Sequence, residues 1–417
     1  MGVIGILLSL YVLMVITTIR IAKNRFGTFL NHYTLTGISW FIFIILSKYF
    51  NNYQIDVSDD IYAIFLIGQI FYCLTVFFVK EQGHKDIYMP IIDINRRRIL
   101  EILLLICLIP AAYLNYKLIM SGVELWQLNS DYWDNQHGGG DYLILQFQQA
   151  IIGPFSLVIM GTSFYSQISN HQNKSNLISV FIAFLIGLSY MLIQGGGRSQ
   201  VMMVVYIAFL AFLASKVYYC KNFVFKLSNA YYVILILVCV LLISWANVGR
   251  GKSGDFIKEA INGQIIFAPL FEYYYSCTSV FNEYLLGCSM FEPIITAIQY
   301  PLKMLFNVQF YKVYNNDLVQ DFIFLSAYGK EYNAGVSAYW YYMRDFGYLG
   351  VVLGPIITAG IYNVLHSFCR KNAFYYIFYN CVVLKGCFAV GYPFGKSFFI
   401  AFIMMLLTFK FIKKREV

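Results

Sequence analysis

Residues 2–19 read GVIGILLSLYVLMVITTI, an apolar run without a charge that is followed by Arg20, Lys23 and Arg25. A helix needs about 20 apolar residues to cross the hydrocarbon core of a bilayer. The run therefore predicts a transmembrane helix. No basic residue precedes it and no small-residue cleavage site closes it, which predicts an uncleaved anchor rather than a cleaved signal peptide.

The composition extends this prediction to the whole chain. Of its 417 residues, 59% are hydrophobic and 12% are charged, whereas a soluble domain carries roughly a quarter charged residues. The 36 Tyr and 38 Phe also exclude a disordered chain, because so many apolar side chains could not stay hydrated as a coil. The sequence therefore predicts an all-α polytopic membrane protein.

Further apolar segments of similar length follow the first one. Each should be a helix, because lipid offers no hydrogen-bond partner to open backbone groups. We expect eleven spans, near residues 2–19, 34–50, 61–79, 99–118, 142–163, 177–194, 201–217, 230–246, 347–366, 374–391 and 395–412.

The Lys and Arg residues of alternate connections predict the orientation. One set of connections holds 18 of them, whereas the opposite set holds 11 together with 16 acidic residues. Cytoplasmic loops carry the excess of Lys and Arg. The N-terminus should therefore lie outside and the C-terminus in the cytoplasm, and the net charge of +9 should face anionic lipid rather than nucleic acid.

One outward connection is much longer than the others. Residues 247–346 contain no expected span, although apolar positions recur in them at helical spacing. We expect short helices there, between an N-terminal bundle at 1–246 and a C-terminal bundle at 347–417. Function should concentrate in this loop.

Three arginines lie on the outward side, close to expected membrane boundaries: Arg198, Arg250 and Arg344. Guanidinium binds phosphate oxygens bidentately and stays charged in a low dielectric. The three arginines together therefore indicate a site for an anionic lipid head group such as a diphosphate. A single arginine of this kind could equally reach a lipid phosphate without further function.

A base in the large loop would have to be a carboxylate, because residues 247–346 contain no His. We expect Glu331 in this role, with Glu272 second, although a solvated surface acid is the plainer interpretation of each. The nine cysteines form no CxxC pair and no cluster with His, so we expect no metal site. Whether Cys277 and Cys288 form a disulfide stays open.

Residues 332–350, YNAGVSAYWYYMRDFGYLG, lead from the large loop into a Gly-rich span. With GGGRS at 195–199 and the further Arg250, this stretch resembles bacterial O-antigen and oligosaccharide repeat-unit polymerases. The sharpest part of the resemblance is Asp345-Phe346-Gly347 with Gly350.

The resemblance implies a glycosyltransferase of the bacterial inner membrane with its large loop in the periplasm. It would transfer a growing glycan from undecaprenyl diphosphate to a new lipid-linked repeat unit, without a metal or another cofactor. Arg198 and Arg250 match the phosphate-binding arginines of the family, and Arg344 is added on its local chemistry. Besides membrane lipids and lipid-linked glycans, the resemblance allows for a chain-length regulator protein as a partner.

Three alternatives remain open. An O-antigen ligase would share the architecture and the arginines. A flippase or transporter of lipid-linked oligosaccharide would also place cations on the outward side, but it usually carries inverted repeats. A non-catalytic membrane scaffold would leave the arginines dispensable.

Overall fold

The computed structural model describes most of the chain as helices. The residues that it describes are 3–51, 53, 55–80, 92–125, 127–128, 152–168, 174–193, 205–207, 209–210, 237–238, 240–245, 248, 256–277, 284–309, 323–324, 331–332, 336–369, 372–388 and 390–414. They belong to two compact units. Unit 1 comprises 1–85, 261–368 and 382–399, and unit 2 comprises 86–260, 369–381 and 400–417.

Unit 1 begins with three successive helices, α1 (Val3–Phe26), α2 (His32–Tyr49) and α3 (Asp59–Leu74), the last of which continues as the 3₁₀ turn η1 (Thr75–Phe78). Asn31 caps α2, because its side chain accepts a hydrogen bond from the amide of Thr34 at 3.0 Å. Helix α1 packs on α2 and α3, with Tyr11, Trp40, Phe43 and Phe65 in the shared core.

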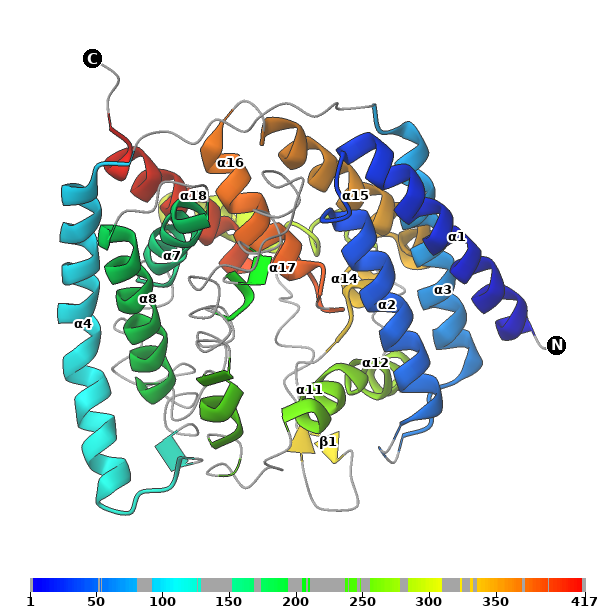
Figure 1. The fold of residues 1–417 in the computed structure, drawn as a ribbon. Coiled ribbons are helices and arrows are strands. Elements are labelled where there is room, and N and C mark those ends of the chain that lie inside the picture. The colour runs from blue at the N-terminus through cyan, green and yellow to red at the C-terminus, as the bar shows by residue number, and fades with distance from the viewer. Residues whose placement is uncertain are drawn as a thin grey trace. The chain divides into compact units, whose positions relative to one another are not determined.

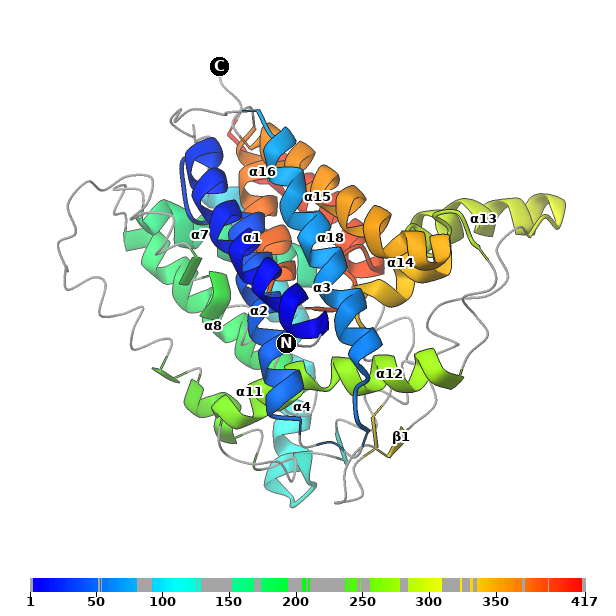
Figure 2. The same cartoon turned by 90° about the vertical axis from the view of Figure 1, so that its right-hand side faces the viewer.

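The large loop supplies shorter elements (Figure 2), which lie in unit 1 except for residues 256–260 in unit 2. These are α11 (Phe256–Ile265), α12 (Phe267–Cys277), α13 (Glu292–Phe306), the two-residue strands β1 (Ile323–Phe324) and β2 (Glu331–Tyr332), and α14 (Ala338–Phe346). The strands pair antiparallel, with Phe324 opposite Glu331. A 3₁₀ turn, η5 (Gly347–Leu349), then leads into α15 (Gly350–Phe368), which packs against α3.

Unit 2 is also built from helices (Figure 1). Helix α4 (Ile94–Met120) packs against α8 (Lys174–Ile193), and α7 (Gly153–Ile168) packs against both. Asp93 caps α4 through the amides of Asn95 and Arg96. The remaining elements are α16 (Ala373–Phe378), the π-helical turn η6 (Tyr379–Val383), α17 (Leu384–Gly386) and α18 (Lys396–Ile412), which continue through both units.

Among the described residues, four helical segments are long and apolar enough to cross a membrane: Val3–Phe26, Asp59–Phe78, Ile94–Met120 and Ala338–Phe368. The expected helical fold is confirmed, and these four segments fit a membrane protein by length and composition. Helices also occupy much of the other expected spans, except that 201–217 and 230–246 lie largely outside the described residues. The count of eleven spans, the orientation and the boundaries at 246 and 346 stay predictions.

The end of the large loop contains a helix that packs on the following one. Residues 338–346 form α14, which contacts α15. Helix α14 is almost entirely buried, although it carries Arg344 and Asp345.

Candidate functional site

The carboxylate of Asp345 holds a neighbouring loop against the end of α14. Its Oδ1 accepts a hydrogen bond from the amide of Ser289 at 2.7 Å, and its Oδ2 accepts one from the amide of Met290 at 2.8 Å. The amides of Leu285 and Leu286 donate to the carbonyls of residues 344 and 345. We call residues 284–290 the clamp loop. Charge-assisted bonds of this kind are roughly twice as strong as neutral ones, so Asp345 fixes the loop on α14.

Two glycines allow α14 and α15 to approach each other closely across η5. Gly347 has a φ of +56°, in the left-handed region that side chains rarely adopt. A Cβ on Gly350 would collide with the carbonyl oxygen of Tyr342. The motif Asp345-Phe346-Gly347 with Gly350, the sharpest part of the sequence resemblance, therefore has a structural function at this junction.

Arg344 lies inside unit 1 rather than on its surface, since only 2% of the residue is exposed. It is within electrostatic range of Asp345 and Tyr341. Tyr341 stacks on Tyr392 with ring centroids 4.2 Å apart, and the Tyr392 hydroxyl donates to the carbonyl of Met290 in the clamp loop. Arg344 therefore belongs to the packed junction of α14 and the clamp loop, and a diphosphate would have to approach it through this junction.

Glu272 on α12 is bonded to the start of α3. Its Oε2 accepts hydrogen bonds from the amide of Ser58 at 2.8 Å and from the Ser58 hydroxyl at 2.7 Å. Its Oε1 accepts one from the Ser276 hydroxyl at 3.2 Å. Each carboxylate oxygen accepts about two hydrogen bonds, so Oε1 retains a position for a further donor.

Helix α12 and the α14–α15 turn are in direct contact. The rings of Tyr274 and Trp340 meet edge to face at 5.8 Å, and the hydroxyls of Tyr275 and Tyr348 are 2.5 Å apart. Burial, followed by this hydrogen bond to Tyr348, raises the pKa of Tyr275 to about 12. The contact brings Glu272 and Arg344, two of the predicted site residues, onto neighbouring helices.

The other predicted site residues cannot be located in the same way. Arg198 and Arg250 lie outside the described residues, and Glu331 is described only as part of strand β2. Their roles stay predictions. Within the described ranges, no group of three or more His, Cys, Asp and Glu could hold a metal ion, and Cys288 is a free thiol.

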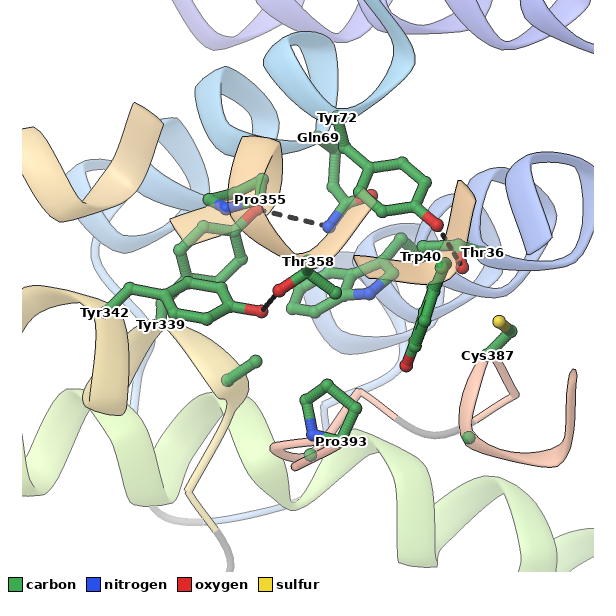
Figure 3. Close-up of a pocket in the computed structure, with 14 residues that line it drawn as sticks. Thr36, Trp40, Gln69, Tyr72, Tyr339, Tyr342, Pro355, Thr358, Cys387 and Pro393 are labelled. Atoms are coloured by element: carbon green, nitrogen blue, oxygen red, sulfur yellow. Dashed lines mark hydrogen bonds between the residues drawn. The ribbon is translucent and has the colours of Figure 1, made fainter. Parts of the chain in front are cut away.

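Unit 1 also contains a small cavity of about 30 Å³ (Figure 3), which the sequence interpretation did not identify. Two non-helical segments meet beside it, because Ser337 pairs with Gly391 and the amide of Ala338 donates to the carbonyl of Val390 at 3.1 Å. Polar and aromatic side chains line it, among them Thr36, Trp40, Gln69, Tyr72, Tyr339, Tyr342, Thr358 and Tyr362. The volume suits one or two water molecules.

The middle of α3 contributes the most polar wall of this cavity. The Gln69 side-chain amide donates to the Tyr339 hydroxyl at 3.1 Å, whereas its buried Oε1 has no hydrogen-bond partner among the described residues. On the opposite side, the hydroxyls of Tyr342 and Thr358 are 2.8 Å apart. Irregular backbone inside a membrane bundle is tolerated only where it is buried in protein or lines a cavity. In the sequence, the three glycines and one proline at 386–395 interrupt an apolar run, and this pattern could have indicated the cavity.

No family model, curated protein or solved structure matches this chain. The likeness of residues 332–350 to repeat-unit polymerases is therefore an interpretation of the sequence.

Proposed function

We propose that this protein is a polytopic membrane glycosyltransferase that polymerises undecaprenyl-diphosphate-linked oligosaccharide repeat units into O-antigen or a related surface polysaccharide. It would act on the periplasmic face of a bacterial inner membrane, with eleven spans, its N-terminus outside and its C-terminus in the cytoplasm. The observation that supports the proposal best is the junction of α12, the clamp loop and α14. There most of α14, which belongs to the segment with the family resemblance, is buried, and Glu272 and Arg344 lie on adjoining helices.

The proposed reaction requires two kinds of protein group: positive charges to stabilise the leaving diphosphate and a base to accept the hydroxyl proton. The donor already carries an activated anomeric carbon with a diphosphate leaving group, so neither a nucleotide nor a metal is required. The acceptor hydroxyl attacks the anomeric carbon, the bond to the diphosphate breaks, and a base removes the hydroxyl proton. Arginines stabilise the charge that develops on the leaving group.

In this proposal Arg198, Arg250 and Arg344 bind the diphosphate. Glu331 is the first choice for the base and Glu272 the second. The three hydrogen bonds that Glu272 accepts favour a positioning role between α12 and α3 for this residue. As a base it would have to use the remaining position on Oε1.

A lipopolysaccharide gel of a deletion strain distinguishes a polymerase from a ligase and from a flippase. Loss of a polymerase leaves lipid A core carrying a single repeat unit. Loss of a ligase leaves bare core, and loss of a flippase retains the repeat units on the cytoplasmic side. Bare core in the deletion strain would contradict the proposal.

Replacement of Arg198 or Arg250 by Ala should abolish chain elongation in a complemented deletion strain. Each loses a charge-assisted contact to the leaving group, which costs about 2–4 kcal/mol, or roughly 30- to 1000-fold in rate. Lys should rescue only partly because it lacks the bidentate fork. Lys303→Ala on the exposed face of α13 is the control and should give a normal ladder. Normal ladders from both Arg variants at normal protein level would refute the assignment.

The cavity beside α3 supports a second candidate, a transporter of lipid-linked oligosaccharide. Transporters place their sites where interrupted helices meet inside the bundle, and the pairing of Ser337 with Gly391 is such a place. The same gel distinguishes this candidate, since a transporter loss would produce no single-repeat band.

A further inference from the structure

Helix α15 has one continuous exposed apolar face. Leu353, Ile356 and Val364 are exposed and follow helical spacing, whereas the opposite positions, such as Val351, are buried in unit 1. The helix belongs to a segment that is long and apolar enough to cross a membrane. In a bilayer this face is the lipid-facing side of the span.

The apolar face continues past the beginning of α15 onto the clamp loop. Tyr348 and Leu349 in η5 are each 69% exposed, and Leu286 in the clamp loop is 78% exposed. The amide of Leu286 donates to the carbonyl of Asp345 at 3.1 Å, which fixes the loop beside η5. The exposed apolar surface therefore extends from the span to the segment that leads into α13.

In helix α13 apolar side chains are exposed and a polar side chain is buried, which is the reverse of the pattern expected for a helix on a protein surface in water. Ile298 and Leu305, which lie on one face, are 53% and 74% exposed, whereas Gln299 on the other side is 3% exposed. With 15 residues, α13 is too short to span the hydrocarbon core. Figure 2 shows it extending away from α14 within unit 1. A helix with one apolar face and one polar face suits the boundary between lipid head groups and acyl chains.

We infer that α13 and the exposed tip of the clamp loop form a lipid-binding surface that lies in the interfacial layer of the bilayer that α15 crosses. The occupant is phospholipid, because the surface is continuous with the lipid-facing side of a span. The contact requires that α15 crosses a membrane and does not depend on the proposed reaction. It would hold the clamp loop, and through Asp345 the end of α14, at the depth where a lipid head group lies.

A fluorescent amino acid at position 305 or 303 measures this contact in the full-length protein. The two variants are reconstituted in nanodiscs of phosphatidylethanolamine and phosphatidylglycerol, with or without lipids that carry a nitroxide on the acyl chain. Leu305 lies on the apolar face, and Lys303, also exposed, lies on the opposite face two residues away. We expect several-fold stronger quenching at position 305 than at position 303. Equal quenching at the two positions, or none at 305, would overturn the inference.

A photo-crosslinking amino acid at the same two positions distinguishes lipid from protein in intact cells. Phospholipid adducts at position 305 and few at 303 are expected. Adducts at 305 that consist of another protein, or of a second copy of this chain, would overturn the lipid assignment. Since residue 305 is exposed, the variant should fold, and its elution as a single symmetric peak in detergent checks this.

Discussion

Helices α13 and α14 belong to the same loop between expected spans. The helix with two charged residues, α14, is buried, whereas the more apolar α13 is exposed. Seven of the nine residues of α14 are buried, including Arg344 and Asp345. Helix α13, which is rich in apolar residues, leaves Ile298, Met304, Leu305 and Phe306 exposed. In a soluble protein the apolar helix would be the buried one. The charged end of α14 is buried where Asp345 finds partners in the clamp loop, and we assign the exposed apolar residues of α13 to contact with lipid.

We expect the largest effect on folding from a substitution at the close approach of α14 to α15. In Gly350→Ala the new methyl group meets the backbone oxygen of Tyr342, which cannot move aside as a side chain could. We expect loss of the monodisperse peak in size-exclusion chromatography in detergent. Gly360→Ala, in open space on the same helix, should elute like the wild type, since Ala favours a helix over Gly by about 1 kcal/mol. Similar behaviour of the two variants would contradict the packing of α14 on α15.

A matched pair of aromatic truncations compares the two helices directly. Trp340 on α14 is fully buried, whereas Phe306 on α13 is 68% exposed. Trp340→Ala should cost about 3–5 kcal/mol of stability, and Phe306→Ala should stay within about 0.5 kcal/mol. Thermal stability in detergent, followed by the loss of the monomer peak after heating, measures the difference. Equal losses would mean that α13 is packed as tightly as α14.

The clamp at Asp345 should have a smaller and more local effect. Asp345→Ala leaves the amides of Ser289 and Met290 without their acceptor, at a cost of about 2–3 kcal/mol. Asp345→Asn retains one acceptor oxygen and should lose less. Hydrogen exchange of the peptide that contains residues 284–290 should speed up in the order wild type, Asn, Ala. Unchanged exchange in Asp345→Ala would show that the loop is held by other contacts.

The helical fold could be predicted from the sequence because the length and hydropathy of an apolar segment indicate whether it forms a helix able to span a membrane. α1, α3 and α4 lie where the apolar runs predicted them. The burial of α14 could not be predicted in this way, since hydropathy takes Arg344 and Asp345 as surface residues. The burial of Asp345 depends on amides of the clamp loop, about 55 residues earlier in the chain.

The candidate site was predictable only in part for the same reason. Arg344 and Glu272 were selected by residue type, and the structure brings their helices together through Tyr274 and Trp340. The cavity beside Gln69 carries no charge, so a search for ionisable residues overlooked it. Segments in which Gly and Pro interrupt an apolar run would have been the better guide.

A reaction with purified components tests directly whether the protein lengthens lipid-linked glycans. The wild-type protein in nanodiscs is supplied with undecaprenyl-diphosphate-linked repeat units in the presence of EDTA and without any nucleotide sugar. The account predicts lipid-linked products of two or more repeat units, with release of one undecaprenyl diphosphate for each bond formed, and no such products from a folded Arg198→Ala variant. Repeat units that stay unchanged with folded wild-type protein, or that are transferred only when lipid A core is added, would contradict it.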